Sequence, residues 1–299
     1  MSSYISLGLS CQSRMTIDAV VGKQRRSPFD YCITEKQALI DALATGGKSF
    51  AHNKDSSSIY TMAAERREGI RSGGVYFWHD YPMADRLQLH ADWAQHIGQV
   101  NEKYDFLWNR FNDNLRASTN PIFVISTTQH NLSQFAKDDS DFAVRFAIDG
   151  QFVDKLSGVL RERCANDFSL LAIVRSFAEA DSIRCRGASD HITVRFLGRL
   201  SLPTHELLVR SFESLAASRS FAALDALEGQ YDNGAKIKRE SDDACRVSRF
   251  RNGKWHPWGE AYVTEGGYLF AFDGHNLLFN AQFIDGRLRF SNNSAWAKV

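Results

Sequence analysis

The segment Tyr4-Ile-Ser-Leu-Gly-Leu-Ser-Cys11 decides how this chain folds at its start. Its first four residues are rich in apolar side chains and the glycine then stops the run, which predicts a short buried strand. From Ser10 the pattern becomes helical and places Cys11, Met15 and Ala19 on one face. The segment therefore predicts a strand, a glycine-containing turn and a helix that begins near Cys11.

Cys11 would lie in the first turn of this helix, where free backbone N–H groups and the positive end of the helix dipole converge. Such surroundings favour a thiolate over a thiol, and they can also hold an oxyanion. The alternative is that Cys11 is a small buried hydrophobic residue, as most free cysteines are. The placement alone leaves both interpretations open.

The composition is that of a globular protein without a strong electrostatic bias. Of its 299 residues 43% are hydrophobic and 24% charged, and a net charge of +1 gives no reason to expect nucleic acid or an anionic membrane as partner. The five cysteines are odd in number and widely spread, which argues against a disulfide framework, and the lack of a CxxC pair argues against a cysteine-rich zinc site. We therefore expect no metal and no cofactor. The lack of a signal peptide and of a long apolar run predicts a cytoplasmic protein without a membrane span.

Two further motifs follow the first helix. In Ser27-Pro-Phe-Asp30 the proline fixes its own φ and biases Ser27 toward an extended conformation. The stretch Val75-Tyr-Phe-Trp-His-Asp-Tyr81 reads as an aromatic strand that ends in a His-Asp pair, suited to a base and its orienting carboxylate. Because adjacent strand residues point to opposite faces, either His79 or Asp80 should face inward.

Pro121–Ser126 is a continuous apolar run, typical of a parallel strand covered on both faces. It ends in a polar cluster with His130 and Asn131, and ligand sites gather at this edge of open α/β sheets. The two residues are therefore secondary site candidates, with simple loop capping as the alternative. Further strands at Phe168–Val174 and Ile192–Leu197 predict a mainly parallel sheet flanked by helices.

Amphipathic periodicity predicts the helices, and polar composition predicts the loops. His52–Gly74 reads as a long surface excursion that could serve as a lid, with one helical turn near Met62–Glu68. The polar segment Gly229–Asp243 reads as a linker. Helices are expected at Glu35–Ala44, over Leu87 to Ile97, over Tyr104 to Leu115, at Gln151–Arg163 and at Leu207–Ala217.

The end of the chain changes character and predicts a small antiparallel β module. Turn pairs separate its short strands, at Asn252-Gly253, Gly266-Gly267, Asp273-Gly274 and Asp285-Gly286. We therefore expect an α/β domain over residues 1–230 and a β module over residues 244–299. Four aromatic residues of the module could form a platform for sugar rings, or could fill its own thin core: Trp255, Trp258, Tyr262 and Tyr268.

Together, Ser6-Leu-Gly-Leu-Ser-Cys11, Ser27-Pro-Phe-Asp30 and Phe77-Trp-His-Asp-Tyr81 resemble an uncharacterised bacterial family described as papain-like cysteine peptidases. The resemblance covers roughly residues 4–130, with Tyr31 where the family usually has Trp, and it does not account for the β module. It implies a papain-like fold as the alternative to a parallel sheet. The first block is also similar to that of small-molecule esterases with a flavodoxin-like sheet, with Cys11 or Ser10 as nucleophile.

The resemblance implies Cys11 as nucleophile and His79 as its base, with Asp30 or Asp80 orienting the imidazole. Backbone N–H groups from Leu9 to Gln12 would stabilise the oxyanion. Other substrate-binding candidates are the neighbouring residues Gly8, Ser10 and Ser27 together with His130 and Asn131.

Three functions remain open on this basis. The first is a cysteine-dependent hydrolase or an acyl- or glycan-modifying transferase, peptidase-like by resemblance. The second is a carbohydrate or nucleotide-sugar enzyme without covalent cysteine catalysis, and the third is a non-catalytic glycan- or protein-binding module. The expected partner is a small-molecule, peptide or glycan substrate, and the oligomeric state is open.

Overall fold

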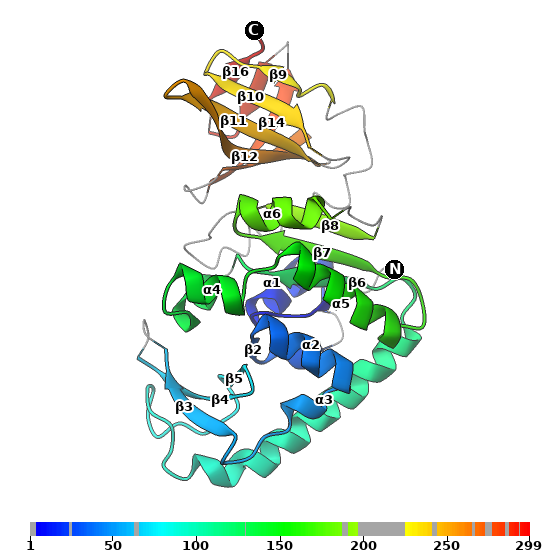
Figure 1. Cartoon of the computed structure of the whole chain (residues 1–299), viewed down its shortest axis with the longest axis vertical. Helices are drawn as coiled ribbons and strands as arrows, with labels where there is room; N and C mark the ends of the chain where they lie inside the picture. The colour runs from blue at the N-terminus through cyan, green and yellow to red at the C-terminus, as the bar shows by residue number, and fades with distance from the viewer. Residues whose placement is uncertain are drawn as a thin grey trace. The chain divides into compact units, whose positions relative to one another are not determined.

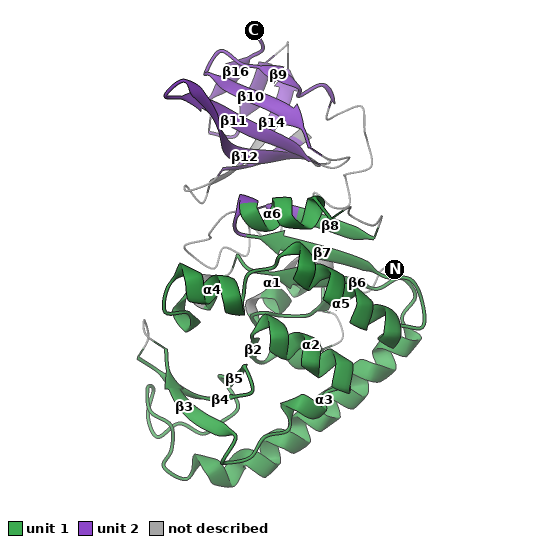
Figure 2. Ribbon diagram, viewed as in Figure 1, with its two compact units in different colours: residues 1–174, 178–194 green, residues 175–177, 195–299 purple. Residues whose placement is uncertain are grey.

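The chain forms two compact units (Figure 2), Met1–Val174 with Ala178–Val194 and Arg175–Phe177 with Arg195–Val299. A computed structural model provides the coordinates. It describes residues 4–23, 26–62, 66–128, 130–186, 191–196, 225–240, 244–264, 267–272, 277–284, 287–292 and 294–299. The predicted helix Leu207–Ala217 lies outside these residues, as does at least one residue of each predicted turn pair other than Asn252-Gly253.

The first unit contains a parallel sheet of four strands in the order β1-β6-β7-β8, as the apolar runs predict. Ser6 at the end of β1 lies opposite Val124, and Ser126 at the end of β6 lies opposite Ile173. The carboxyl ends of neighbouring strands therefore meet at one edge. The strands are β1 (Tyr4–Ser6), β6 (Ile122–Ser126), β7 (Ser169–Val174) and β8 (Ile192–Phe196).

Helices connect and cover these strands (Figure 1). They are α1 (Gln12–Val21), α2 (Lys36–Thr45), α3 (Ile97–Ala117), α4 (Asp139–Arg145), α5 (Gly150–Arg163) and α6 (Phe177–Arg184), with short 3₁₀ turns η1 (Pro28–Asp30), η2 (Lys48–Phe50), η3 (Trp93–His96) and η4 (His130–Phe135). Local signals set their ends. Asp149 caps α5 by accepting from the Phe152 N–H, and Gly46 ends α2 in the left-handed conformation.

Long α3 buries a 3.6-residue stripe that includes Tyr104, Leu107 and Phe111, as its periodicity predicts. The helix predicted from Leu87 onward is wrong, because its first residues form bends and only η3 is helical before Ile97. Asp85 explains part of this difference, since its carboxylate accepts from the backbone N–H groups of Leu87 and Gln88. Within the described residues, no helix has the length and apolar character needed to cross a membrane.

A second sheet of the first unit has the order β2-β5-β4-β3 and is antiparallel. Its strands are β2 (Ile33–Thr34), β3 (Ser57–Thr61), β4 (Glu68–Ser72) and β5 (Val75–Phe77). The predicted loop at His52–Gly74 is therefore wrong where it forms β3 and β4. Gly73 and Gly74, with φ of 54° and 81°, make the β4–β5 turn. Edge strand β3 is mostly solvent-facing, so its sequence carries little apolar pattern.

The second unit contains an antiparallel meander of eight strands. They are β9 (Gly229–Gln230), β10 (Ala235–Arg239), β11 (Cys245–Arg251), β12 (Lys254–Thr264), β13 (Gly267–Phe272), β14 (Leu277–Ile284), β15 (Arg287–Phe290) and β16 (Ala295–Ala297). The meander closes on itself, because the Val299 N–H donates to Gln230 O at 3.0 Å and Tyr231 bridges to Lys298.

The predicted β module is thus larger than expected, and the predicted linker Gly229–Asp243 is wrong where it forms β9 and β10. Ala235 and Ile237 of β10 point into the core, and Lys236 and Lys238 alternate with them. Because of these charged residues, the sequence resembles that of a polar linker. The predicted Asn252-Gly253 turn is confirmed by its two positive φ values of 51° and 76°.

Candidate functional site

The first and second sequence motifs meet at the carboxyl end of β1. The Ser27 hydroxyl donates to Ser6 O at 2.8 Å, which ties η1 to the last residue of the strand. Beyond the turn, the Thr34 N–H donates to Leu9 O at 3.0 Å. Two hydrogen bonds therefore hold residues 27–34 against the segment that leads into Cys11.

The third motif joins through β2. Ile33 and Thr34 pair antiparallel with Tyr76 and Val75 of β5, and this strand leads directly into His79. The three motifs, which are separated by tens of residues in the sequence, are thus neighbours in space. Their spacing in the sequence gives no sign of these contacts, since each one joins distant residues.

Gly8 makes the turn between β1 and α1 possible. Its φ of +90° is a conformation that side-chain-bearing residues rarely adopt, and a Cβ there would lie 3.1 Å from Thr34 Oγ1. The Ser13 hydroxyl donates to Gly8 O at 3.2 Å, so the first turn of α1 is bonded back to this glycine. Glycine at position 8 therefore allows both the turn and the close approach of β2.

Cys11 is the N-cap residue of α1 rather than a residue of its first turn, with φ −56° and ψ −21°. It is a free, half-buried thiol, so it is neither sealed in the core nor fully exposed. Within α1, Met15 is 53% exposed while Ile17 is buried. Burial raises the pKa of Cys32 and of Tyr60, and Cys11 adds a smaller contribution in the same direction, so these two side chains lie in its electrostatic range.

Cys32 is buried and lies within the electrostatic range of Cys11. This residue was not identified from the sequence. Its Sγ lies 3.6 Å from Pro28 O. Burial first, and then the charges of Asp80 and Cys11, hold the pKa of Cys32 well above its usual range. Cys32 is consequently a neutral thiol, whereas Cys11 is the more accessible of the two.

Asp80 points inward, as one member of the His79–Asp80 pair must. Its carboxylate is fully buried; it accepts from the Tyr104 hydroxyl at 3.0 Å and forms a short ion pair with Lys103. The Lys103 ammonium also lies over the ring of Tyr31, 4.5 Å from the ring centre. Asp80 thus anchors α3 to the end of β5 by a charge pair whose carboxylate is buried.

Asp30 is also buried, with its side chain fully shielded from solvent. The Ser27 N–H donates to its Oδ2 at 2.8 Å and the Ser27 hydroxyl to its Oδ1 at 3.3 Å, while Arg14 Nε lies 3.8 Å away. Burial raises the pKa of Asp30 to about 6, against the opposing influence of these hydrogen bonds and of Arg14. Asp30 therefore joins η1 to α1.

His79 is exposed, and its ring meets Trp78 edge-on. Within the described residues, neither Asp30 nor Asp80 is hydrogen-bonded to His79. The choice between these carboxylates as the group that orients His79 stays a prediction.

His52 was missed by the sequence analysis because it lies in a polar stretch. It is buried, with Nδ1 3.0 Å from Phe50 O and Nε2 2.5 Å from the Tyr81 hydroxyl, and its ring stacks on Phe77. Burial lowers its pKa. Its two ring nitrogens are both engaged, so His52 serves the packing between η2 and the end of β5.

The polar end of β6 lies at the same sheet edge as the Cys11 segment. The Leu7 N–H donates to Val124 O at 2.9 Å, which aligns the two strand ends, and Ser126 and Thr128 share a buried hydrogen bond of 2.9 Å. His130 and Asn131 begin η4 directly after this edge. The role of His130 and Asn131 as site residues stays a prediction.

The aromatic platform predicted in the β module is not formed as a set. Tyr262 and Tyr268 are buried, which agrees with the core alternative, and Trp255 is exposed on the outer side. Trp258 is half-buried and lines a pocket with other aromatic side chains. The four residues therefore have different environments.

The fold and the candidate site define a two-unit α/β protein with a half-buried cysteine at the start of a helix. Comparison with protein-family models, curated proteins and solved structures gives no match for this chain.

Proposed function

We propose that this chain is a cysteine-dependent enzyme of acyl transfer, a hydrolase or a transferase, with Cys11 as nucleophile and His79 as general base. The observation that carries the proposal is the convergence of the three motifs on Cys11. Ser27 and Thr34 bond to Ser6 and Leu9 on either side of the glycine turn, and β2 pairs with the strand that leads into His79. These hydrogen bonds and the β2–β5 pairing support a site assembled around the Cys11 thiol.

The chemistry follows from the position of Cys11. A thiolate at a helix N-cap is favoured by the helix dipole and by backbone N–H groups. His79 would accept the thiol proton of Cys11, the resulting thiolate would attack the acyl carbon, and His79 would then pass the proton to the leaving group. The N–H groups from Leu9 to Gln12 would stabilise the negative oxygen of the tetrahedral intermediate. Water, or another acceptor in a transferase, would then release the acyl group.

The remaining candidates take supporting roles in this proposal. Gly8 and Ser10 would shape the turn below the acyl group, and Ser27 would hold η1 in place. His130 and Asn131 follow the end of β6, which lies beside β1, so they would contact the substrate from that side. The resemblance to papain-like peptidases favours an amide as the bond that is broken, in the context of a parallel sheet.

The pH dependence of Cys11 alkylation by iodoacetamide tests the proposal, with mass spectrometry resolving the five cysteines. We expect Cys11 to react selectively below pH 7, about one unit or more below an ordinary thiol. His79→Ala should remove this selectivity, and His90→Ala, another exposed histidine, should leave it unchanged. If Cys11 is alkylated slowly, and only at alkaline pH, in the wild type and in both variants alike, the proposal is overturned.

A further inference from the structure

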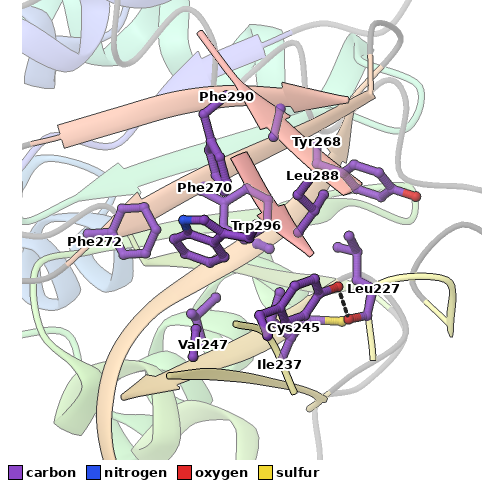
Figure 3. Close-up of a cluster of buried hydrophobic side chains, with 14 residues drawn as sticks. Leu227, Ile237, Cys245, Val247, Tyr268, Phe270, Phe272, Leu288, Phe290 and Trp296 are labelled. Carbon is purple, nitrogen blue, oxygen red and sulfur yellow. Dashed lines mark hydrogen bonds between the residues drawn. The ribbon is translucent and has the colours of Figure 1, made fainter. Parts of the chain in front are cut away.

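The closed meander of the second unit has an aromatic pocket that the proposed function does not use. Its volume is about 250 Å³. Among the described residues, five aromatic and two small polar ones line it: Trp258, Phe272, Phe279, Phe290, Trp296, Asn292 and Ser294. Figure 3 shows the rings of Phe272, Phe290 and Trp296 together at one side of the core cluster, away from Leu227 and Tyr268.

A β-bulge turns Trp258 into this pocket. Val247 of β11 pairs with Gly259 and Ser248 with Pro257, so Trp258 is the extra residue without a partner across the ladder. Such bulges redirect one side chain and recur beside functional sites. A Cβ at Gly259 would lie 2.4 Å from Ala271 O, so only glycine allows the backbone next to Trp258 to approach β13 this closely.

The rings form a preformed wall at one side of the core cluster. Trp258 stacks on Trp296 with ring centres 5.7 Å apart and lies 4.5 Å from Phe272, while Phe290 lies 4.5 Å from Trp296. A cavity of about 150 Å³ lined by apolar side chains holds benzene. The larger volume here therefore accepts one aromatic ring with a short substituent.

The polar groups of the pocket disfavour a sugar. The Ser294 hydroxyl and N–H both donate to Asn292 Oδ1, at 2.6 and 3.0 Å, so this oxygen and these two donors are already engaged. A sugar ring would bring several hydroxyl groups against a wall of rings that offers them few partners. The lining thus favours a mainly apolar group.

Arg249 gives the pocket a positive charge at one side. It lies opposite Ala235, whose side chain is part of the meander core, so Arg249 points to the same inner face. Its guanidinium lies over the Trp258 ring, 5.0 Å from the ring centre. Within the described residues no carboxylate pairs with Arg249, and none is among the described lining residues. A cationic ligand is therefore disfavoured and an anionic one is favoured.

We propose that this pocket binds a small organic carboxylate whose apolar end is about the size of one aromatic ring. The ring would insert between Trp258, Phe279 and Phe290, and the carboxylate would pair with Arg249. Guanidinium–carboxylate pairing is geometrically specific, so Arg249 would select anions over neutral or cationic analogues. This site is independent of Cys11 and stands whether or not the acyl-transfer proposal holds.

Calorimetric titration of the full chain with phenylacetate, phenylacetamide and phenethylamine tests this inference. We expect phenylacetate to bind with a dissociation constant of about 1 mM or tighter, about tenfold tighter than the amide. Phenethylamine should bind most weakly. Equal affinity for the three compounds, tighter binding of the amine, or no saturable binding of phenylacetate would each overturn the inference.

Variants separate the charge from the aromatic wall. Arg249→Gln should weaken phenylacetate binding about tenfold and leave phenylacetamide binding unchanged. Arg251→Gln is the matched control, because Arg251 is an exposed arginine of the same strand. Phe279→Ala should weaken both compounds, and Cys11→Ser should weaken neither. An Arg249→Gln protein that binds phenylacetate as well as wild type contradicts the proposed role of the charge, and unchanged binding by Phe279→Ala contradicts the location.

Discussion

Ser27 and Ser6 lie 21 residues apart in the chain, yet the Ser27 hydroxyl donates a 2.8 Å hydrogen bond to the Ser6 carbonyl oxygen. Ser6 ends β1, two residues before the glycine turn. The same Ser27 bonds to Asp30 through both its N–H and its hydroxyl. This small buried network therefore fixes the second motif beneath the segment that positions Cys11.

Replacing Ser27 by alanine should loosen this arrangement. The Ser6 carbonyl and the Asp30 carboxylate each lose a buried donor, so we expect the free energy of unfolding to fall by about 1–2 kcal/mol. Urea denaturation measures the loss, and the rate of Cys11 alkylation should change with it. Ser58→Ala, at an exposed position of β3, is the control and should change neither quantity.

Gly8→Ala should be more harmful than Gly22→Ala, although both glycines have a positive φ, of +90° and +78°. Both substitutions introduce backbone strain of about 1–2 kcal/mol. Only at Gly8 does the new Cβ also meet Thr34 Oγ1, at 3.1 Å, whereas nothing lies within 4 Å at Gly22. We expect altered Cys11 alkylation in Gly8→Ala alone, and equal effects of the two variants on alkylation and unfolding would contradict this account.

Asp30 should make the stability of the chain depend on pH. Burial raises its pKa from 3.8 to about 6, so the folded chain favours the protonated carboxyl. The resulting stabilisation is fully present below pH 3.8 and is lost as the pH rises through about 6. From this shift its size is at most about 3 kcal/mol.

The test is the unfolding free energy of wild type and Asp30→Asn, measured by urea denaturation between acid and neutral pH. The wild type should lose stability relative to Asp30→Asn as the pH rises through this window. The exposed Asp55 provides the control, and Asp55→Asn should keep the wild-type profile. A constant difference between wild type and Asp30→Asn at all pH values would count against the raised pKa.

The buried Asp80 should depend on Lys103. Lys103→Met leaves the fully shielded carboxylate with only the Tyr104 hydroxyl, so we expect a loss of about 2 kcal/mol in unfolding free energy. The double variant Asp80→Asn/Lys103→Met should recover much of it, because the uncompensated charge is then gone. Lys54→Met, at an exposed position, serves as the control. Additive effects of the two substitutions would show that the pair is not coupled.

Much of the first unit could be predicted from local patterns. The apolar runs of β6 and β7, the turn at Gly8 and the periodic stripe of α3 each carry their signal within a short window. The strands β3, β9 and β10 escaped prediction for a physical reason. Strand β3 lies at the edge of its sheet, β9 has two residues, and lysines alternate with the core residues of β10, so pairing with neighbouring strands defines all three.

The candidate site divides in the same way. The sequence by itself determined that Cys11 follows a glycine turn at the start of a helix, because backbone conformation and helix start signals are local. Only the tertiary structure decided that Ser27 bonds to Ser6, that Cys32 and Tyr60 lie near Cys11, and that Lys103 pairs with Asp80. These relationships join distant residues, and they form only when burial removes water and leaves each polar group one partner within reach.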